Sequence, residues 1–220
     1  QMLYVPTTRS IGKLIKAILY DLDGVLVNAT EWHYESLNLA LKEVVGFEIG
    51  REEHISTFNG IPTNTKLDIL KKQNRLREEQ FQEIWDLKQE KTFEVIENNA
   101  FVDNVKIRLH EGTSNLRKVC VTNSISKSAE LMLKKTGQLK YMEFVLSNED
   151  VWRPKPFPEG YIKAMIKLDL HPDECMVVED SPKGLEAAKW SGANVYEVKG
   201  YHDVTLENIL TKINFFNRGK

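Results

Sequence analysis

Cysteine is scarce in this sequence, which contains only Cys120 and Cys175. Each lies beside valine or methionine in a short apolar run, so we expect buried thiols in a reducing compartment, which favours a cytoplasmic protein. Long apolar runs are missing too, since stretches such as FVLS and CMVV are far shorter than a membrane-spanning helix. The first residues, QMLYVPTTRSIGK, lack the sustained apolar core of a secretory signal. We expect them to form a short N-terminal arm, partly disordered.

The sequence also lacks a strong excess of charge of either sign. Its formal net charge is −2, and its basic residues are spread along the chain. We therefore expect no nucleic-acid partner and no membrane surface as partner. A length of 220 residues with 41% hydrophobic residues is enough for one large domain, or for one domain with a smaller insert.

Five short apolar runs predict the strands of a parallel sheet. They occupy residues 17–21, 118–122, 143–147, 175–179 and 194–198. Most of the segments between them have helical spacing, as in the apolar stripe of Tyr161, Ala164, Met165 and Leu168. The segment SPKGLEAAKWSG has Ser181 as a helix N-cap, Pro182 at the first helical position and Gly192 near the end. Alternating strands and helices indicate an α/β fold built from right-handed βαβ units.

Residues 30–98 contain no strand candidate and are too long for an ordinary crossover. One helical stripe comprises His33, Leu37, Ala40, Leu41 and Val44, and a second begins with Phe81, Ile84 and Trp85. The charged stretch KKQNRLREEQ is typical of a solvated helix surface. We predict a core domain of residues 1–29 and 99–220 with an inserted all-helical cap domain of residues 30–98. The cap shows no apolar interface stripe, which favours a monomer.

Polar side chains follow the apolar runs at the points where the strands should end. Asp21 and Asp23 follow the first strand, and the second ends in Thr122, Asn123 and Ser124. Lys155 follows the third strand, and the fourth ends in Glu179, Asp180 and Ser181. Ligands of open parallel sheets bind beyond the carboxyl ends of the strands. We therefore expect four carboxylates and an ammonium group at one edge of the sheet.

Four ionised carboxylates at one edge repel one another, and a divalent cation resolves that conflict. Oxygen-only ligands suit Mg²⁺, which shares its remaining positions with water and phosphate. A carboxylate held there can attack phosphorus, and a second carboxylate two residues further on can handle the proton. Lys155 and Thr122 can bind the phosphoryl oxygens, together with backbone N–H groups at the helix start after Ser124.

Four segments in this order resemble the motifs of the haloacid dehalogenase superfamily of hydrolases: DLDGVLVN, VTNS, RPKPFPEGY and VVEDSPKGLEAAKWSG. The helical insert directly after the first motif resembles the subgroup with a helical cap, which includes β-phosphoglucomutase and phosphoglycolate-type phosphatases. The resemblance covers nearly the whole chain from about residue 16. It implies a Rossmann-like three-layer sandwich with a mobile cap that closes over the substrate.

The resemblance also implies roles for individual residues. Asp21 would be the nucleophile and Asp23 the general acid/base. Asp21, Asp180 and the backbone carbonyl of Asp23 would hold Mg²⁺, with Glu179 in or next to that shell. Because the family's dehalogenases lack the acid at Asp23, its presence favours phosphoryl transfer.

Thr122 and Lys155 would bind the phosphoryl group, and we count their neighbours Asn123 and Ser124 among the substrate-binding candidates. In the family's phosphonate-cleaving members a cap lysine forms a Schiff base, and neither Lys42 nor Lys66 lies in a context resembling that site. Phosphonate cleavage is therefore disfavoured.

Three cap residues are further substrate-binding candidates. His33 lies ten residues after Asp23, where capped relatives have a histidine near the active site. Gly60 begins a segment resembling the Gly-x-x-x-Arg specificity loop, with Asn64 in place of the arginine. Asn64 carries no charge, although Lys66 is close in sequence, so we expect a substrate whose far end is neutral or weakly polar.

The sequence thus predicts a Mg²⁺-dependent phosphatase that hydrolyses a small phosphorylated metabolite through an aspartyl-phosphate. The alternative is a sugar phosphomutase of the β-phosphoglucomutase type, and a catalytically silent phosphate-binding relative is a third hypothesis. Asn28 replaces an aspartate common in relatives, and we expect this change to tune the entrance of the site.

Overall fold

The computed structural model describes residues 13–218, so the expected N-terminal arm of residues 1–12 lies outside the described residues. Five parallel strands form one sheet in the order β3-β2-β1-β4-β5. They are β1 (Ala17–Tyr20), β2 (Arg117–Val121), β3 (Phe144–Leu146), β4 (Cys175–Glu179) and β5 (Asn194–Glu197). All five predicted strands are confirmed, with ends that differ by at most one residue. β1 is central because it pairs with both β2 and β4, for example through Leu19 with Val119 and with Val177.

Nine α-helices accompany the sheet within residues 13–218. They are α1 (Thr30–Val45), α2 (Arg51–Glu53), α3 (Thr63–Lys72), α4 (Phe81–Asn99), α5 (Asn104–Gly112), α6 (Ser126–Lys135), α7 (Glu159–Leu168), α8 (Pro182–Ser191) and α9 (Leu206–Arg218). A π-helical turn spans His54–Phe58, and short 3-10 helices span Glu78–Gln80, Leu139–Tyr141, Asn148–Asp150, Pro172–Glu174 and Tyr201–Asp203. None of the described helices is both long and apolar enough to cross a bilayer.

The alternation of side chains along β1 builds the two sides of a three-layer sandwich. Ile18 and Tyr20 pack into one buried cluster with side chains from α5, α6 and α9. Ala17 and Leu19 face the other way and pack with side chains from α7 and α8. Because a strand buried on both faces needs apolar residues at every position, β1 reads as a continuous apolar run. The Rossmann-like fold class is confirmed.

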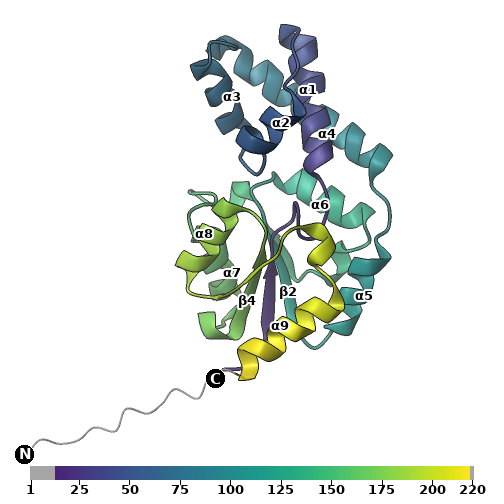
Figure 1. The fold of residues 1–220 in the computed structure, drawn as a ribbon, viewed down its shortest axis with the longest axis vertical. Coiled ribbons are helices and arrows are strands. Elements are labelled where there is room, and N and C mark those ends of the chain that lie inside the picture. The colour runs from purple at the N-terminus through teal and green to yellow at the C-terminus, as the bar shows by residue number, and fades with distance from the viewer. Residues whose placement is uncertain (1–12, 219–220) are drawn as a thin grey trace, which may run out of the picture.

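The helices α1 to α4 form an all-helical cap above the carboxyl ends of the strands (Figure 1). The cap has its own buried cluster, which includes Leu37 and Leu41 of α1, Leu67 of α3 and Ile84 of α4. α1 and α4 pack against each other along the cap. The inserted helical cap is confirmed, and its exact boundaries stay a prediction.

The predicted start and end of α8 are confirmed. The Ser181 side chain accepts a hydrogen bond from the backbone N–H of Gly184, with Pro182 opening α8 and Gly192 ending it in the left-handed conformation. Both cysteines are buried free thiols. This helix start positions the loop between β4 and α8, where the predicted site residue Asp180 lies.

Candidate active site

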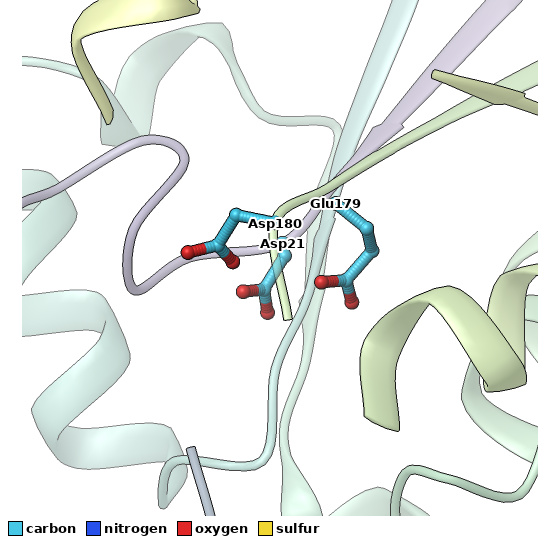
Figure 2. A group of neighbouring side chains, drawn as sticks. All are labelled: Asp21, Glu179 and Asp180. Atoms are coloured by element: carbon cyan, nitrogen blue, oxygen red, sulfur yellow. The ribbon is translucent and has the colours of Figure 1, made fainter. Parts of the chain in front are cut away.

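Three acidic side chains meet where β1 and β4 end. Asp21 follows β1, Glu179 is the last residue of β4, and Asp180 is the next residue. One carboxylate oxygen from each lies within 4.8 Å of the others (Figure 2). The structure therefore brings together acids that are far apart in the sequence, at the sheet edge where the sequence predicts them.

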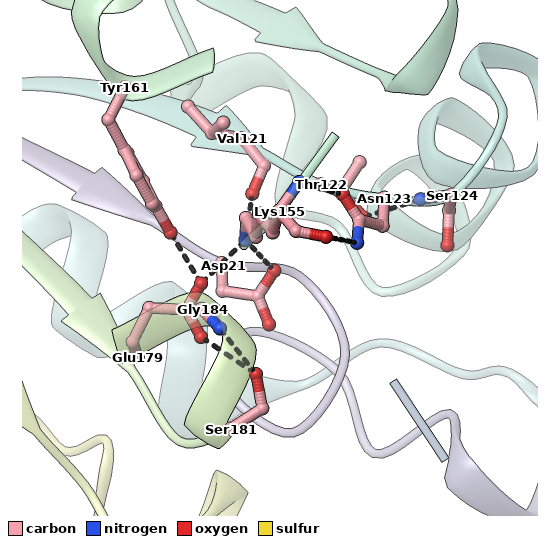
Figure 3. A network of polar contacts seen from close by, with 10 residues as sticks. All are labelled: Asp21, Val121, Thr122, Asn123, Ser124, Lys155, Tyr161, Glu179, Ser181 and Gly184. Atoms are coloured by element: carbon pink, nitrogen blue, oxygen red, sulfur yellow. Dashed lines mark hydrogen bonds and ion pairs between the residues drawn. The ribbon is translucent and has the colours of Figure 1, made fainter. Parts of the chain in front are cut away.

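Lys155 joins two of these acids. Its Nζ donates to Asp21 Oδ1 at 2.5 Å and to Glu179 Oε1 at 2.6 Å, and also to the backbone oxygen of Val121 at 2.8 Å (Figure 3). The Tyr161 hydroxyl donates to the same Glu179 oxygen at 2.6 Å. All three donors of the lysine ammonium are thus used, and Glu179 is held in one position.

The electrostatics of this cluster are dominated by burial. Burial, with the nearby Glu179 charge, raises the pKa of Asp21 well above its usual range, against the opposing effect of Lys155. Burial and the Glu179 charge likewise raise the pKa of Asp180 to about 7. Burial lowers the pKa of Lys155, but Asp21 and Glu179 outweigh that effect and raise it. When all three acids are ionised, their negative charges exceed the single positive charge of Lys155, so the cluster has room for a further cation.

The donor chemistry of the cluster fits a hard divalent cation such as Mg²⁺. Every candidate ligand is a carboxylate oxygen, and Asp180 Oδ1 is buried without a hydrogen-bond partner among the described residues. An unpaired buried carboxylate oxygen is costly, and a metal ion would satisfy it. The Asp23 side chain is not part of the three-acid group.

Two glycines leave room for the acids. Gly24 has a φ of +83°, and a Cβ there would lie 2.1 Å from Asp180 Oδ2. A Cβ on Gly184 would lie 2.1 Å from the carboxylate of Glu179. The chain can therefore bring its first motif and the start of α8 against these carboxylates only because both positions lack a side chain.

Asp23 lies beside the cluster, in a different environment. Its Oδ1 accepts a hydrogen bond from the backbone N–H of Ala29 at 3.0 Å, and its Oδ2 lies 3.8 Å from Nε2 of His33. Burial raises the pKa of Asp23 to about 6. Burial and the charges of Lys88 and Lys66 hold the pKa of His33 well below its usual range, so this imidazole is neutral at pH 7.

The residues after β2 shape the opposite side of the site. Thr122 Oγ1 accepts from the backbone N–H of Ser124 at 3.0 Å. The Asn123 side chain makes two hydrogen bonds with the Lys155 backbone, accepting from its N–H at 3.0 Å and donating to its oxygen at 3.2 Å. Asn123, expected at the substrate, thus fixes the loop that carries Lys155.

The start of α6 differs from the sequence-based expectation of a free anion site. The backbone N–H of Ser126 donates to a Glu149 carboxylate oxygen at 2.6 Å. A protein carboxylate already satisfies this first N–H group of the helix. No pattern in the sequence predicts this contact, because Glu149 lies in the short 3-10 helix after β3, more than twenty positions away.

A cavity of about 120 Å³ lies between the acidic cluster and the cap. Its lining includes the predicted cap residues His33, Gly60 and Asn64, together with Lys66, Lys88 and Gln89. Gly60 marks the meeting point of cap and core, because a Cβ there would lie 4.0 Å from Cβ of Ser181. The cavity thus joins the strand ends to the cap.

Lys88 was missed in the sequence, although a signal was present. It lies on the stripe that begins with Ile84 and Trp85 and continues to Thr92 and Val95, so a lysine interrupts an otherwise inward-facing row. Tyr161 is a similar case, since a buried tyrosine hydroxyl in an apolar stripe needs a partner. Both residues reach the site from helix faces whose apolar stripes predict packing surfaces.

Asn28 lies elsewhere than expected. It lines a separate cavity with Trp32, Asn99, Asp103 and Tyr201, where the chain passes between core and cap. The active-site cavity does not include it among its lining residues. The expectation that Asn28 tunes the entrance of the site is therefore not supported.

Comparisons with known proteins agree with this geometry. Residues 18–198 match the family model described as haloacid dehalogenase-like hydrolase. A protein named putative pyrophosphatase PpaX from Clostridium perfringens is 28% identical over 201 residues, which are 89% of each chain. A phosphorylated carbohydrates phosphatase from Thermotoga maritima is 25% identical over 188 residues, 81% of this chain and 82% of the relative.

Solved structures share the fold. β-Phosphoglucomutase from Clostridium difficile aligns with a TM-score of 0.76 at 21% identity, over 92% of this chain and 99% of the other. A predicted phosphoglycolate phosphatase from Haemophilus somnus aligns with a TM-score of 0.72 at 24% identity, over 91% and 98%. With the family match spanning most of its length, this chain belongs to the haloacid dehalogenase-like hydrolases.

Proposed function

We propose that the protein is a Mg²⁺-dependent phosphatase that hydrolyses a small phosphomonoester through an aspartyl-phosphate on Asp21. The observation that carries this proposal is the position of Lys155, which bridges Asp21 and Glu179 at the floor of a cavity closed by the cap. A lysine in that position can exchange one of its present hydrogen bonds for one to a phosphoryl oxygen and still hold the attacking carboxylate. The phosphatase names of the sequence relatives support the same reaction class.

Two chemical steps follow from the arrangement of the two aspartates. An Asp21 oxygen attacks phosphorus, the bond from phosphorus to the ester oxygen breaks, and Asp23 donates its proton to the leaving alcohol. Asp23 then takes a proton from water, whose oxygen attacks the phosphorus and releases inorganic phosphate from Asp21. Because its pKa is raised to about 6, Asp23 holds and releases a proton near neutral pH.

Mg²⁺ would be held by Asp21 and Asp180 with the backbone carbonyl of Asp23, and Glu179 would lie next to that shell. When bound, the ion offsets the negative charge of the phosphoryl oxygens and of the acids. Thr122 and Lys155 would bind the phosphoryl oxygens, with Ser124 beside them. His33, Gly60 and Asn64 would contact the remainder of the substrate.

The cap would exclude bulk water during the first step and admit one water molecule for the second. We propose that it spans residues 30–98 and that the core spans residues 1–29 and 99–220. A monomeric state and a reducing, cytoplasmic location stay predictions from composition.

The proposal is tested by following phosphate release from a panel of phosphorylated metabolites, with Mg²⁺ and with EDTA. We expect release from at least one ester with Mg²⁺ and none with EDTA. Release that is equal in EDTA would contradict the metal dependence, and no release from any ester would contradict the phosphatase.

A phosphomutase is the second candidate, because Lys66 and Lys88 line the cap side of the cavity and give a second phosphate its counter-charge. Incubation with a hexose 1-phosphate and its bisphosphate separates the two candidates. A mutase yields the 6-phosphate, whereas a phosphatase yields free phosphate.

A further inference from the structure

A second cavity, of about 1050 Å³, lies between the helices α4, α5 and α6. None of the residues that line it lines the active-site cavity. Ligand cavities in proteins usually measure about 300–1,000 Å³, so the space is sufficient for a small molecule. α4 brings the chain back from the cap, and α6 begins shortly after the site residues 122–124, so this cavity adjoins both cap and core.

One wall of this cavity is apolar. Phe93 of α4, Ile107 of α5 and Leu131 of α6 line it from three helices, and Val102 and Leu139 line it as well. Leu131 and Leu139 also pack against the buried cluster of the core, so this wall is fixed to the interior of the protein. Burial of an aliphatic chain against such a wall is favourable in proportion to the apolar area removed from water.

The other lining residues are a glycine and five charged residues, namely Gly137, Glu97, Lys127, Glu130, Lys134 and Lys140. Among residues 13–218, no neutral polar side chain lines the cavity. Sugars and nucleosides are oriented by precisely placed polar groups of that kind. The lining therefore fits a ligand with an apolar body and a charged end.

The charges around the cavity favour a negative end. Glu97 is already paired with Lys135, whose Nζ lies 2.6 Å from its carboxylate. The three lysines that line the cavity form no ion pair within residues 13–218, and Glu130 is the one lining acid that is not paired there. Lys127 Nζ lies 4.4 Å from the centre of the Phe93 ring, so a free positive charge directly adjoins the apolar wall. Such an excess of positive charge attracts an anionic head group.

We propose that this cavity binds an amphiphilic anion, a small molecule whose aliphatic chain packs on the apolar wall and whose carboxylate meets the lysines. A free fatty acid has this chemistry. The inference goes beyond the proposed phosphatase function and does not depend on it, because none of the lining residues has a role in the reaction. Because α4 and α6 both line the cavity, the bound chain contacts cap and core at once.

Calorimetric titration with decanoate, below its micelle concentration, tests the ligand class. Hexanoate, with a shorter chain, and decyltrimethylammonium, with the opposite charge, are the comparison probes. Decanoate should bind as one molecule per chain and at least about tenfold more tightly than either probe, because the buried methylene groups and the lysine charges both contribute. Equal affinity for either comparison probe would overturn the inference.

Val102→Asp tests the apolar wall, with Val105→Asp as its matched control. The two valines are 55% and 56% exposed, so both variants should fold, and only Val102 lines the cavity. Val102→Asp should weaken decanoate binding by about tenfold, because it places a charge beside the aliphatic chain, whereas Val105→Asp should leave it unchanged. Equal affinities of the two variants would overturn the location of the site.

Lys134→Glu tests the charge in the same way. Lys134 and Lys189 are both exposed and lie in the last turn of a helix, α6 and α8, and only Lys134 lines the cavity. Lys134→Glu should weaken decanoate binding by about fivefold, while Lys189→Glu, which changes the net charge equally, should leave it unchanged. Equal effects of the two variants would overturn the role of the lysines.

Sedimentation analysis separates a small ligand from a second copy of this chain. We expect a sedimentation coefficient that is independent of protein concentration, with and without decanoate. A dimer that forms on concentration, and that Val102→Asp dissociates while Val105→Asp does not, would assign the cavity to a protein interface and overturn the inference.

Discussion

The core and the cap meet the cavity with lysines in opposite states. In the core, Lys155 donates to two carboxylates and a backbone oxygen, so its charge is fully paired before any ligand arrives. In the cap, Lys66 and Lys88 are even less exposed than Lys155, yet none of the described acids makes an ion pair or a hydrogen bond with them. The core therefore neutralises its buried lysine within the fold, whereas the cap holds two buried lysines without an acid partner among the described residues.

The two regions also share a device for holding a loop. Asn123 bonds to both backbone groups of Lys155 in the core. In the cap, Asn38 accepts from the N–H of Ile49 at 2.8 Å and donates to its oxygen at 3.0 Å. Each asparagine side chain thus pairs with both backbone groups of another residue, as a neighbouring β-strand would.

The largest effect is expected at the core nucleophile. Asp21→Asn should reduce phosphate release by about 10⁴-fold or more, because an amide does not attack phosphorus. The fold should survive, since the side chain keeps its size, and circular dichroism will check this. Activity within tenfold of the unmodified enzyme would contradict the proposed mechanism.

A pair of glycines separates metal binding from backbone strain. Gly24→Ala should weaken Mg²⁺ binding by about 10–100-fold, because the new Cβ would displace Asp180. Gly46→Ala in the cap is the control, since its φ of +76° is similar but no atom lies within 4 Å of the added Cβ. Both variants should lose about 1 kcal/mol of stability from the left-handed backbone.

Titration of Mg²⁺ against turnover, together with urea unfolding, provides both readouts. If Gly46→Ala weakens Mg²⁺ binding as much as Gly24→Ala does, the contact with Asp180 is not the cause. Equal unfolding of the two variants with different metal affinity would assign the loss of Mg²⁺ to that contact.

Acid should destabilise both regions through histidines whose pKa is lowered by burial, namely His110 in the core and His54, besides His33, in the cap. Burial lowers the pKa of His110 in the core and of His54 in the cap from 6.5 to about 4. The unfolded chain binds these protons at a higher pH than the folded chain does. The contribution of these two histidines to stability is therefore complete above about pH 6.5 and is lost as the pH drops towards 4, by on the order of 3 kcal/mol per histidine.

Substitution by phenylalanine distinguishes the two histidines. His54→Phe should flatten the acid loss without lowering stability at pH 7, because neither ring nitrogen of His54 has a hydrogen-bond partner among the described residues. His110→Phe should flatten it too, but cost about 1 kcal/mol at pH 7 through the lost bond to Gln138. Urea unfolding at pH 7 and 5 measures both, and curves parallel to the unmodified protein would contradict the assignment.

The smallest effect on turnover is expected for the asparagines. Asn123→Ala and Asn38→Ala should each destabilise the protein by about 1–3 kcal/mol, because each leaves two backbone groups without their partner. Only Asn123→Ala should also slow turnover, by about tenfold, since it releases the loop that carries Lys155. An equal loss of turnover in Asn38→Ala would show that the hydrogen bonds of Asn123 and Asn38 do not differ in function.

The sequence predicted the core well for a physical reason. Buried parallel strands are continuous apolar runs, so the polar residues that end them, such as Asp21 and Glu179, stand out. The cap offers no such boundary, because its site residues lie on helices where a lysine on the inner face looks like one on the outer face. Lys88 is recognisable only as a break in the apolar stripe of α4.

Contacts between distant loops were also beyond prediction. The Glu149 carboxylate at the start of α6 and the cavity around Asn28 depend on how β3 and the crossings between core and cap are placed in space. No periodicity or spacing in the sequence carries that information. Tertiary packing decides these contacts, whereas local pattern decides the strands and helix caps.

The pairing of α1 with α4 has a consequence for how this protein can change. The cap leaves the core after Ala29 and returns at Ala100, and the helices at these two ends pack against each other. The inserted segment therefore starts and ends at two helices that contact each other. Another pair of packed helices could replace it between these positions, which would change the surface that faces the ligand while the strands and the acids at their ends keep their places.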